Sequence, residues 1–528
     1  MKMKVMKTKI CLWSVLLLTV VITSCREESD VLQSYAFDDK MAFEEAKNSY
    51  AGKFKVLWKA LDQNYGIWDY ERSYGLDWDA VYDEFLPLYE ALDERKDVSD
   101  ADLKALLEQT VAPLHDGHFV AQMHNHQTGN YVLVSPSNLR VQKRDDYGIT
   151  ENFTPHLEAY YPVEYEGNGD IVEGMEAGTD VVTLLGDVYN NPDKGYQWAK
   201  AELVRLAELP TPTDLETFRI KGLMSFITDM KDLLSRTLEP STIVSIYNQL
   251  VAIYDYLEIP GLEPINSNFA TYGIKLKYAL FRNNVAYFYL SDFSLSAYLD
   301  DSAVPEAFPG ANAKTIARIK TIRAVWQAWF DKVQSLHASG QLRGVIIDVR
   351  NNSGGMFADY AYVLGSLLPS GGIDFGNLRF KRGLGRYDYS PLSPFHFKTL
   401  KDAHSTITEP IVVLANCRSV SMAEVTALTC KNLSNGYMVG KHTHGGICGL
   451  KTDHYDYSTD YAGIIGTRNE TPVWLYIPVG VTMDNDKNIY EGIGVAPDIE
   501  VDFDANLFTT KGRDSQLERA LQFLNTGR

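Results

Sequence analysis

The chain has 528 residues and a net charge of −19, from 50 basic and 69 acidic side chains. This length allows about two to four domains with a large core, and the negative balance argues against nucleic acid as a partner. The sequence contains no cysteine and histidine spacing typical of a zinc site, and we expect no metal or organic cofactor.

The N-terminus is typical of an export signal. Lysines precede a short apolar run over residues 10–22, and Thr23, Ser24 and Cys25 follow it. The run is too short for a comfortable membrane span. Residues 22–25 also resemble the lipobox of bacterial lipoproteins, in which the cysteine is lipidated. We therefore expect residues 1–25 to be a lipoprotein signal peptide, with Cys25 anchoring the protein in a membrane of the bacterial cell envelope; ordinary cleavage nearby is the alternative.

Residues 26–129 form a predicted N-terminal helical domain. Apolar side chains recur at helical spacing over residues 42–61, and a second helix is predicted over residues 103–110 with Ser99 or Asp100 as its cap. Asp116 and Gly117 then indicate a sharp turn that presents His118 just before a strand over residues 119–122.

Residues 130–277 form a less regular middle region of mixed α and β structure. Strands are predicted over residues 131–134 and 139–141, a turn and strand over residues 174–187, and helices over residues 196–209 and 215–257. Two interpretations stay open for this region. It is a peptide-binding module with a helical insertion, or a cap without a function of its own.

Residues 278–528 alternate between predicted strands and helices. The strands, over residues 285–290, 344–349 and 411–415, are almost continuously apolar, and the helices cover residues 313–336 and 358–368 and a segment starting at Ser421. This pattern is typical of parallel βαβ units. Active residues gather at the carboxyl ends of such strands, which here are the loops over residues 350–355 and 416–421.

Ser421 is the candidate nucleophile. A serine at a helix start lies beside free backbone N–H groups, which suit the oxyanion of acyl transfer. The N–H groups of Met422 and of Gly354 or Gly355 are the candidate oxyanion donors. The alternatives are structural: Ser421 and Glu424 have the spacing of a capping box, and the two glycines suit a plain turn.

Three cysteines follow the signal segment: Cys417, Cys430 and Cys448. One disulfide and one free thiol is a possible arrangement in an oxidising compartment, and the sequence does not select the pair. A thiol nucleophile is the rival hypothesis to Ser421. None of the three cysteines occupies the helix-start position.

Residues 346–355 (IIDVRNNSGG), 412–424 (VVLANCRSVSMAE) and 490–499 (YEGIGVAPDI) resemble motifs of the carboxyl-terminal processing, or tail-specific, serine peptidases. The resemblance covers about residues 278–502. It implies an α/β fold with a ClpP/crotonase-like βαβ peptidase core, places the nucleophile on Ser421, and places the oxyanion glycine on Gly354 or Gly355. Family members often carry a PDZ module, which residues 174–187 resemble only faintly.

The general base departs from the serine/lysine branch of this family. That branch has a lysine twenty-five residues after the nucleophile, where this chain has Gly446; Lys441 and Lys451 flank the position out of register. The tricorn-like branch instead uses an upstream histidine after an L-x-D-G-H pattern, oriented through a hydroxyl and a glutamate. Residues 114–118 fit that pattern with His118 as the base.

Glu491 fits the glutamate of the tricorn-like branch, whereas the hydroxyl has no match because Gly117 precedes His118. His444 is a second candidate base, and His115 lies on the far side of the Asp-Gly bend. A neutral histidine has a pKa suited to general base catalysis near pH 7.

The resemblance implies a serine endopeptidase that forms an acyl-enzyme on Ser421, with His118 as base and Glu491 in support, and that acts on peptides or unfolded proteins. The alternative is a non-catalytic peptide- or ligand-binding surface lipoprotein on the same fold, since a lost lysine is also what decay would leave. A third hypothesis, a surface protein that handles carbohydrate, is supported only by the aromatic content of the sequence. The contact between His118 and Ser421 discriminates between catalysis and binding.

Overall fold

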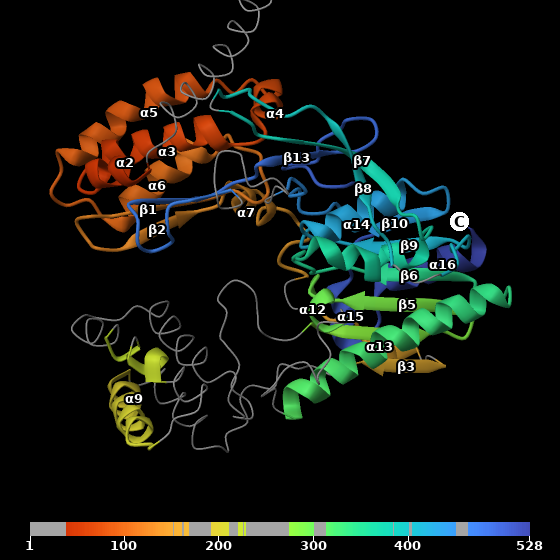
Figure 1. Cartoon of the computed structure of the whole chain (residues 1–528). Coiled ribbons are helices and arrows are strands. Elements are labelled where there is room, and N and C mark those ends of the chain that lie inside the picture. Colours follow the sequence, from red (N-terminus) through yellow and green to blue (C-terminus); the bar gives the residue numbers. More distant parts are fainter. Residues whose placement is uncertain are drawn as a thin grey trace, which may run out of the picture.

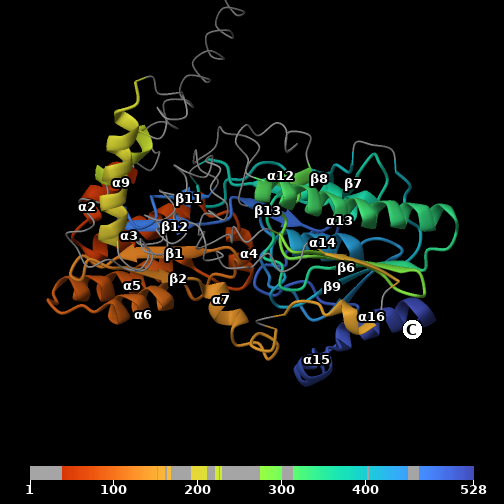
Figure 2. The same cartoon turned by 90° about the horizontal axis from the view of Figure 1, so that it is seen from below.

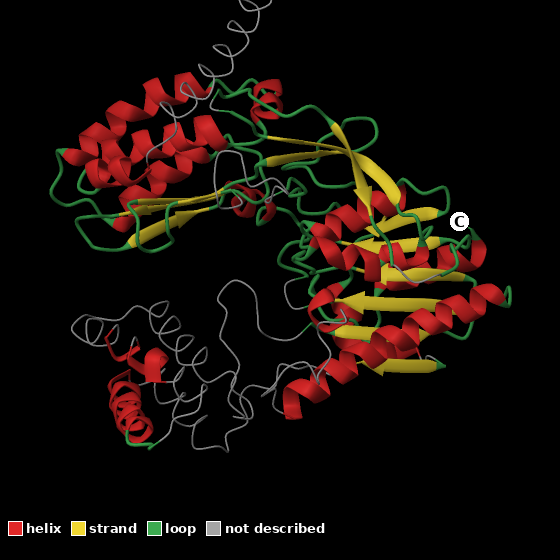
Figure 3. Ribbon diagram, in the orientation of Figure 1, coloured by secondary structure: helices red, strands yellow, loops and turns green. Residues whose placement is uncertain are grey.

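The computed structural model describes the chain over residues 39–150, 153–160, 163–167, 192–210, 220–224, 226–228, 274–299, 313–383, 385–400, 404–449 and 463–527. Helices gather in the N-terminal part, and a large sheet covered by helices forms the C-terminal part (Figure 3). The two parts lie side by side in both cartoon views (Figures 1 and 2). This arrangement confirms the predicted α/β class with an N-terminal helical region.

The largest sheet has seven strands in the order β14-β10-β9-β6-β5-β4-β3 (Figure 1). Its strands are β3 (Glu164–Gly167), β4 (Leu276–Leu280), β5 (Val285–Leu290), β6 (Gly344–Asp348), β9 (Ile411–Ala415), β10 (Gly436–Gly440) and β14 (Ile499–Glu500). Neighbours from β5 to β14 are parallel, and β3 and β4 add an antiparallel edge. Every residue of β5, β6 and β9 is buried, which explains their continuous apolar sequence.

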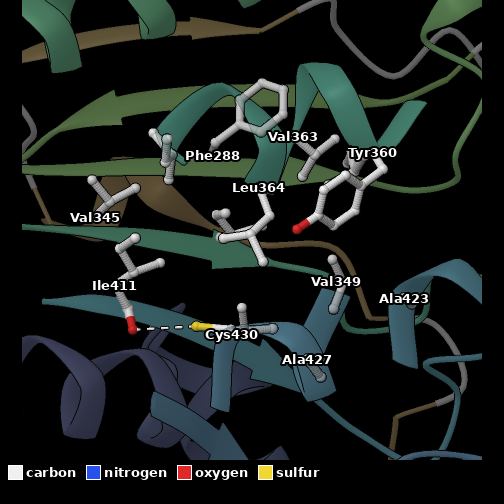
Figure 4. Close-up of a cluster of buried hydrophobic side chains, with 14 of the residues drawn as sticks. Phe288, Val345, Val349, Tyr360, Val363, Leu364, Ile411, Ala423, Ala427 and Cys430 are labelled. Carbon is white, nitrogen blue, oxygen red and sulfur yellow. Dashed lines mark hydrogen bonds between the residues drawn. The ribbon is translucent and has the colours of Figure 1, made fainter. Parts of the chain in front are cut away.

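Helices cover both faces of this sheet. One face carries α12 (Ser296–Leu299), α13 (Ala313–Ala338), α14 (Met422–Lys431) and the 3-10 segments η4 (Phe357–Tyr362) and η5 (Leu364–Leu367); the other carries η1 (Leu157–Tyr160), α15 (Ala505–Lys511) and α16 (Ser515–Thr526). Side chains alternate between the faces along each strand: Ile347 packs with the first layer and Ile346 with the second. Figure 4 shows the first layer, where the Cys430 thiol donates to the Ile411 carbonyl at 3.5 Å.

The N-terminal helices pack on a separate four-stranded antiparallel sheet. The helices are α2 (Asp39–Ala46), α3 (Tyr50–Asn64), α4 (Trp68–Ser73), α5 (Trp78–Asp93) and α6 (Asp100–Val111). The strand order is β11-β12-β1-β2, with β1 (Val120–His124), β2 (Tyr131–Val134), β11 (Ile464–Ile465) and β12 (Val473–Tyr476). Because β12 pairs with β1, a late segment of the chain is attached to the strand that follows His118.

A third sheet connects the two parts. It consists of β7 (Ile373–Phe380), β8 (Ser393–Phe397) and β13 (Gly480–Met483), in the order β13-β7-β8, and β7 and β8 extend from the large sheet towards α4 (Figure 1). Arg386, beyond β7, forms ion pairs with Asp62 and Asp79, both at 2.6 Å, and Arg379 pairs with Asp69 at 2.9 Å. These charges join the β7–β8 connection to the helical part.

Most of the predicted elements are confirmed. The strands over residues 131–134, 285–290 and 411–415 are β2, β5 and β9, and the helices over residues 103–110 and 313–336 lie within α6 and α13. Ser99 caps α6 by accepting the Asp102 N–H at 3.1 Å. These are the segments in which local periodicity and burial agree.

Three predictions are wrong in detail. Residues 139–141 lie in the helix α7 (Pro136–Val141), not in a strand, because Pro136 occupies the first helical turn. Residues 358–368 form η4 and η5 instead of one helix, with a break at Val363, where φ is −98° and ψ is −107°. Residues 42–61 form two helices, because Ser49 caps α3 by accepting the Gly52 N–H.

The middle region is described only in part. The helix α9 (Pro192–Ala207) confirms most of the helix predicted over residues 196–209. Residues 174–187, most of residues 215–257 and the signal over residues 1–25 lie outside the described residues. Both interpretations of the middle region therefore stay open, and the domain boundaries at residues 129 and 277 stay predictions. Within the described part, no helix combines the length and apolarity needed to cross a membrane.

Candidate active site

Ser421 occupies the turn between β9 and α14 with an unusual backbone conformation. Its φ is 56° and its ψ is −115°, in a region that residues with a side chain seldom adopt. Its N–H donates to the Gly446 carbonyl and to the Glu424 carboxylate, both at 3.1 Å. Ser421 is thus held at the start of α14 by partners on both sides, and Glu424 binds the N-cap backbone as the predicted capping box requires.

The two predicted loops meet at this turn. The Val420 N–H donates to the Asn352 carbonyl at 2.9 Å, and the Ser419 hydroxyl donates to the Val349 carbonyl at 2.7 Å. A Cβ atom on Gly354 would lie 2.6 Å from the Ser421 Cβ and 3.0 Å from the Met422 nitrogen. The absence of a side chain at Gly354, whose φ is +88°, therefore allows the loops to approach.

The structure distinguishes the two glycines of the loop. The Gly354 N–H donates to the Asn352 side-chain oxygen at 2.8 Å. Among the described residues, neither the Gly355 N–H nor the Met422 N–H has a hydrogen-bond partner, and Gly355 is exposed. Gly355 and Met422 are therefore the candidate oxyanion donors, whereas Gly354 serves the close approach to Ser421.

His118 lies on a loop held by a buried carboxylate. The Asp116 Oδ1 atom accepts the N–H groups of His118 and Phe119. Both ring nitrogens of His118 are shielded from solvent and have no hydrogen-bond partner in the described part of the chain. Burial, with a smaller effect from His444, lowers the pKa of His118 to about 4. The imidazole is thus neutral at pH 7, the form that accepts a proton.

The loop of His118 packs directly on the loop that binds Ser421. A Cβ atom on Gly446 would lie 3.1 Å from the Gly117 Cα, and the Gly446 carbonyl accepts the Ser421 N–H. The backbones on which the candidate nucleophile and base lie are therefore linked through one glycine pair. No hydrogen bond joins the Ser421 and His118 side chains, and catalytic hydrogen bonds in proteins without substrate are often longer than in the complex.

Two buried carboxylates hold the segment over residues 445–448. Glu424 accepts the N–H groups of Gly445 at 2.7 Å and of Gly446 at 2.8 Å, and Glu491 accepts those of Ile447 and Cys448, both at 2.6 Å. Burial raises the pKa of Glu424 to about 7 and raises that of Glu491. Four consecutive N–H groups are thus bound by carboxylates, which fixes the path of the segment.

Glu491 also accepts the Gly117 N–H at 2.7 Å. Its carboxylate makes no hydrogen bond to the His118 ring, so the contact it offers the base runs through the backbone of the preceding residue. The sequence did not predict this backbone contact, the hydrogen bonds from the Gly445 and Gly446 N–H groups to Glu424, or the role of Asp116 in holding the His118 loop. The only signal for Asp116 was its place in the Asp-Gly-His turn.

The other histidines have different surroundings. The His115 Nδ1 lies 2.7 Å from the Glu71 carboxylate, and its ring stacks on Tyr74. His444 is buried, donates its backbone N–H to the Ser419 carbonyl at 3.0 Å, and has its pKa lowered to about 4, chiefly by burial. The structure thus places His444 beside the same loops, whereas the His115 ring is engaged elsewhere.

Lys441 has the surroundings of a surface ion pair. Its ammonium group lies 2.7 Å from Glu500 and 2.8 Å from Asp502, and the hydrogen bonds to these carboxylates raise its pKa. A lysine base needs a lowered pKa. Lys451 lies outside the described residues.

Replacing Lys441 by alanine is expected to leave the reaction of Ser421 with a serine-directed probe unchanged within about twofold. Exposed ion pairs contribute about 1 kcal/mol or less to stability, so the variant should also fold normally. The rate of labelling measures the effect. A loss of labelling in a normally folded Lys441→Ala variant would instead make Lys441 the candidate base.

The three cysteines are buried and free, so the proposed arrangement with one disulfide is not present. Burial raises the pKa of the Cys417 and Cys430 thiols to about 12, and that of Cys448 is also raised. The thiolate is the reactive form, so these surroundings disfavour the thiol nucleophile. Among the described residues, no cluster of three or more histidine, cysteine or acidic side chains suits a metal ion.

A buried ion cluster lies beneath the glycine loop. The Arg350 guanidinium pairs with Asp348 at 2.6 Å and Asp514 at 2.7 Å, and its side chain is fully buried. It also lies 4.2 Å from the centre of the Phe153 ring. Arg350 thus joins the end of β6 to the start of α16, which supports the loop that carries Gly355.

Comparison with known proteins finds a family match in the C-terminal part. Residues 315–501 match Peptidase family S41, a serine-type peptidase family, which supports the resemblance at family level. A family of this kind acts on peptides or proteins. A search of the curated proteins finds no match to this chain.

Three solved structures show the range of similarity. A putative peptidase from Parabacteroides merdae ATCC 43184 is 16% identical over 90% of this chain and 96% of its own, with a TM-score of 0.44. Mature CPAF complexed with lactacystin is 12% identical over 92% and 98%, with a TM-score of 0.43. The tricorn protease is 18% identical over 46% of this chain and 17% of its own, with a TM-score of 0.26.

Proposed function

We propose that this protein is a serine endopeptidase in which Ser421 is the nucleophile, His118 is the general base, and the N–H groups of Gly355 and Met422 bind the oxyanion. One observation carries the proposal: a strained serine stands at a helix start, beside two backbone N–H groups that have no partner among the described residues. Free donors aimed at developing charge are the main requirement for acyl transfer.

The steps follow from these positions. The Ser421 hydroxyl loses its proton to the neutral His118 imidazole as its oxygen attacks the peptide carbonyl. The carbonyl oxygen becomes negative and accepts hydrogen bonds from Gly355 and Met422. The amine leaves with the proton from His118, and an acyl-enzyme remains. Water, deprotonated by His118, attacks the ester; the acid product leaves, and His118 returns the proton to the Ser421 oxygen, which restores the hydroxyl.

Glu491 and Glu424 are positioning residues in this proposal. Their carboxylates bind the backbone of residues 445–448 and of Gly117, and they touch neither the reacting oxygen nor the imidazole ring. The anchor is a separate proposal: lipidation at Cys25 would hold the peptidase at a membrane of the cell envelope, and a Cys25→Ser variant that stays membrane-bound would contradict it.

The expected result of a fluorophosphonate experiment on the form lacking residues 1–25 is labelling at Ser421, found by peptide mapping, and none in Ser421→Ala. A peptide library should be cleaved in the same samples. Ser353→Ala is the matched control, because Ser353 is an exposed serine on the glycine loop, and labelling should persist in it. A folded protein that neither reacts nor cleaves would instead favour the peptide- or ligand-binding lipoprotein.

A further inference from the structure

We propose that the contact between Gly117 and Gly446 sets the position of His118 relative to Ser421, and that a side chain at position 446, including a lysine, is disfavoured by this contact. The inference rests on the proposed function, since it concerns the placement of the base in that mechanism. Gly117 and Gly446 act as positioning residues, because neither contributes a side chain to the reaction.

The two backbones lie in tight contact, with less room at Gly117 than at Gly446. A Cβ atom on Gly117 would lie closer than 3.0 Å to the Gly445 carbonyl and to the Gly446 Cα, and one on Gly446 would lie 3.1 Å from the Gly117 Cα and 3.3 Å from its carbonyl carbon. These neighbours are backbone atoms, which cannot swing away. Neither glycine has a positive φ, so glycine is needed here for the contact and not for a turn.

Buried hydrogen bonds hold both sides of the contact in place. On one side, Gly446 donates to Glu424 at 2.8 Å and its carbonyl accepts the Ser421 N–H at 3.1 Å. On the other side, the Gly117 N–H donates to Glu491 at 2.7 Å. Glu491 also binds the Ile447 N–H at 2.6 Å, so one carboxylate clamps the two loops together.

Movement at this contact must therefore change the site. Separating the loops would break the hydrogen bond from the Gly117 N–H to the fully buried Glu491 carboxylate, which is costly because buried polar groups would lose a partner. Pushing the Gly446 backbone away would instead pull on the Ser421 N–H. A side chain at either position therefore changes the separation of the loops that carry His118 and Ser421.

Two alanine variants test the inference by a graded effect. Gly117→Ala meets backbone atoms closer than 3.0 Å, whereas Gly446→Ala meets the looser contact of 3.1 Å. We expect the rate of fluorophosphonate labelling to fall by about 100-fold or more in Gly117→Ala, because a displacement of about 1 Å costs that order of rate. The loss in Gly446→Ala should be smaller, and this variant should stay folded.

Two control glycines separate positioning from stability. Gly371 has no positive φ and nothing near its Cβ position, so Gly371→Ala should change nothing. A Cβ atom on Gly436, in β10, would collide with the Cys430 carbonyl, so Gly436→Ala should lower the melting temperature. The dependence of the labelling rate on pH should nevertheless stay that of the wild type in the molecules that remain folded. In Gly446→Ala, by contrast, labelling should be lost at a higher pH on acidification than in the wild type. The reason is that a displaced His118 regains contact with water, which favours its protonated form.

A lysine variant completes the test. The Gly446→Lys variant should be labelled by the fluorophosphonate no faster than the Gly446→Ala variant. The double variant His118→Ala/Gly446→Lys should be labelled no faster than His118→Ala alone. Restored labelling would show that the contact does not disfavour a lysine at position 446, and wild-type rates and pH profiles in Gly117→Ala and Gly446→Ala would overturn the positioning role. Failure of the proposed function has a different signature, because the wild-type protein itself would then not react.

Discussion

Replacing His118 by alanine is expected to lower the rate at which a fluorophosphonate labels Ser421 by about 100- to 10,000-fold, the usual contribution of a general base. The Ser421 hydroxyl would keep its place at the start of α14, and the candidate oxyanion donors would be unchanged. It would lose the neutral acceptor whose ring nitrogens have no other partner in the described residues. Labelling rates at pH 7.5 measure the effect.

Two histidines serve as controls for this variant. His115→Ala should retain labelling, because the His115 ring is bonded to Glu71. His444→Ala tests the rival base, since His444 lies beside the same loops. If labelling is lost in His444→Ala and kept in His118→Ala, the assignment of the base is wrong.

The pH dependence of His118 has a definite sign. Its pKa is lowered to about 4, so the neutral form should support labelling well below pH 6.5 and lose it as the pH approaches 4. Between these values the unfolded chain binds a proton that the folded protein does not, so this group makes the unfolding free energy fall on acidification. Glu424, with its pKa raised to about 7, acts in the opposite sense, so wild type and His118→Ala should be compared.

Replacing Arg350 by methionine is expected to lower the unfolding free energy by about 3–5 kcal/mol, the cost of removing one partner from a buried ion pair. Asp348 and Asp514 would remain buried without the guanidinium that pairs with both. The glycine loop would lose its support, so labelling of Ser421 should fall as well. Urea unfolding gives the free energy through the shift of the midpoint at constant slope.

Arg513 is the matched control for Arg350. It forms an ion pair with Glu518 at 2.6 Å, and its side chain is 52% exposed. Arg513→Met should therefore leave the midpoint of urea unfolding nearly unchanged. Equal losses in the two variants would show that burial does not distinguish these arginines and would contradict the role given to Arg350.

Patterns over a few neighbouring residues correctly predicted those elements whose structure depends on burial and hydrogen bonds within the same segment. The apolar runs that became β5 and β9 record burial on both faces of a sheet, and Ser99 marked the start of α6 through a hydrogen bond within one turn. The segment over residues 358–368 was predicted as one helix, and yet it forms two short 3-10 segments. The break lies at Val363, and Gly365 after it lies close to the Tyr360 carbonyl.

The sequence by itself determined the class of the fold, the strand–turn–helix that presents Ser421, and the residue types available for the chemistry. The structure showed which glycine keeps a free N–H, because the side chain of Asn352, two residues earlier, accepts the N–H of Gly354. It also brought Gly117 against Gly446, and with it the loop of His118 to that of Ser421. Strands and caps arise from interactions within a few residues and leave a period or a spacing in the sequence. The close approach of two backbone segments more than three hundred residues apart leaves only one trace in the sequence, which is a glycine in each segment.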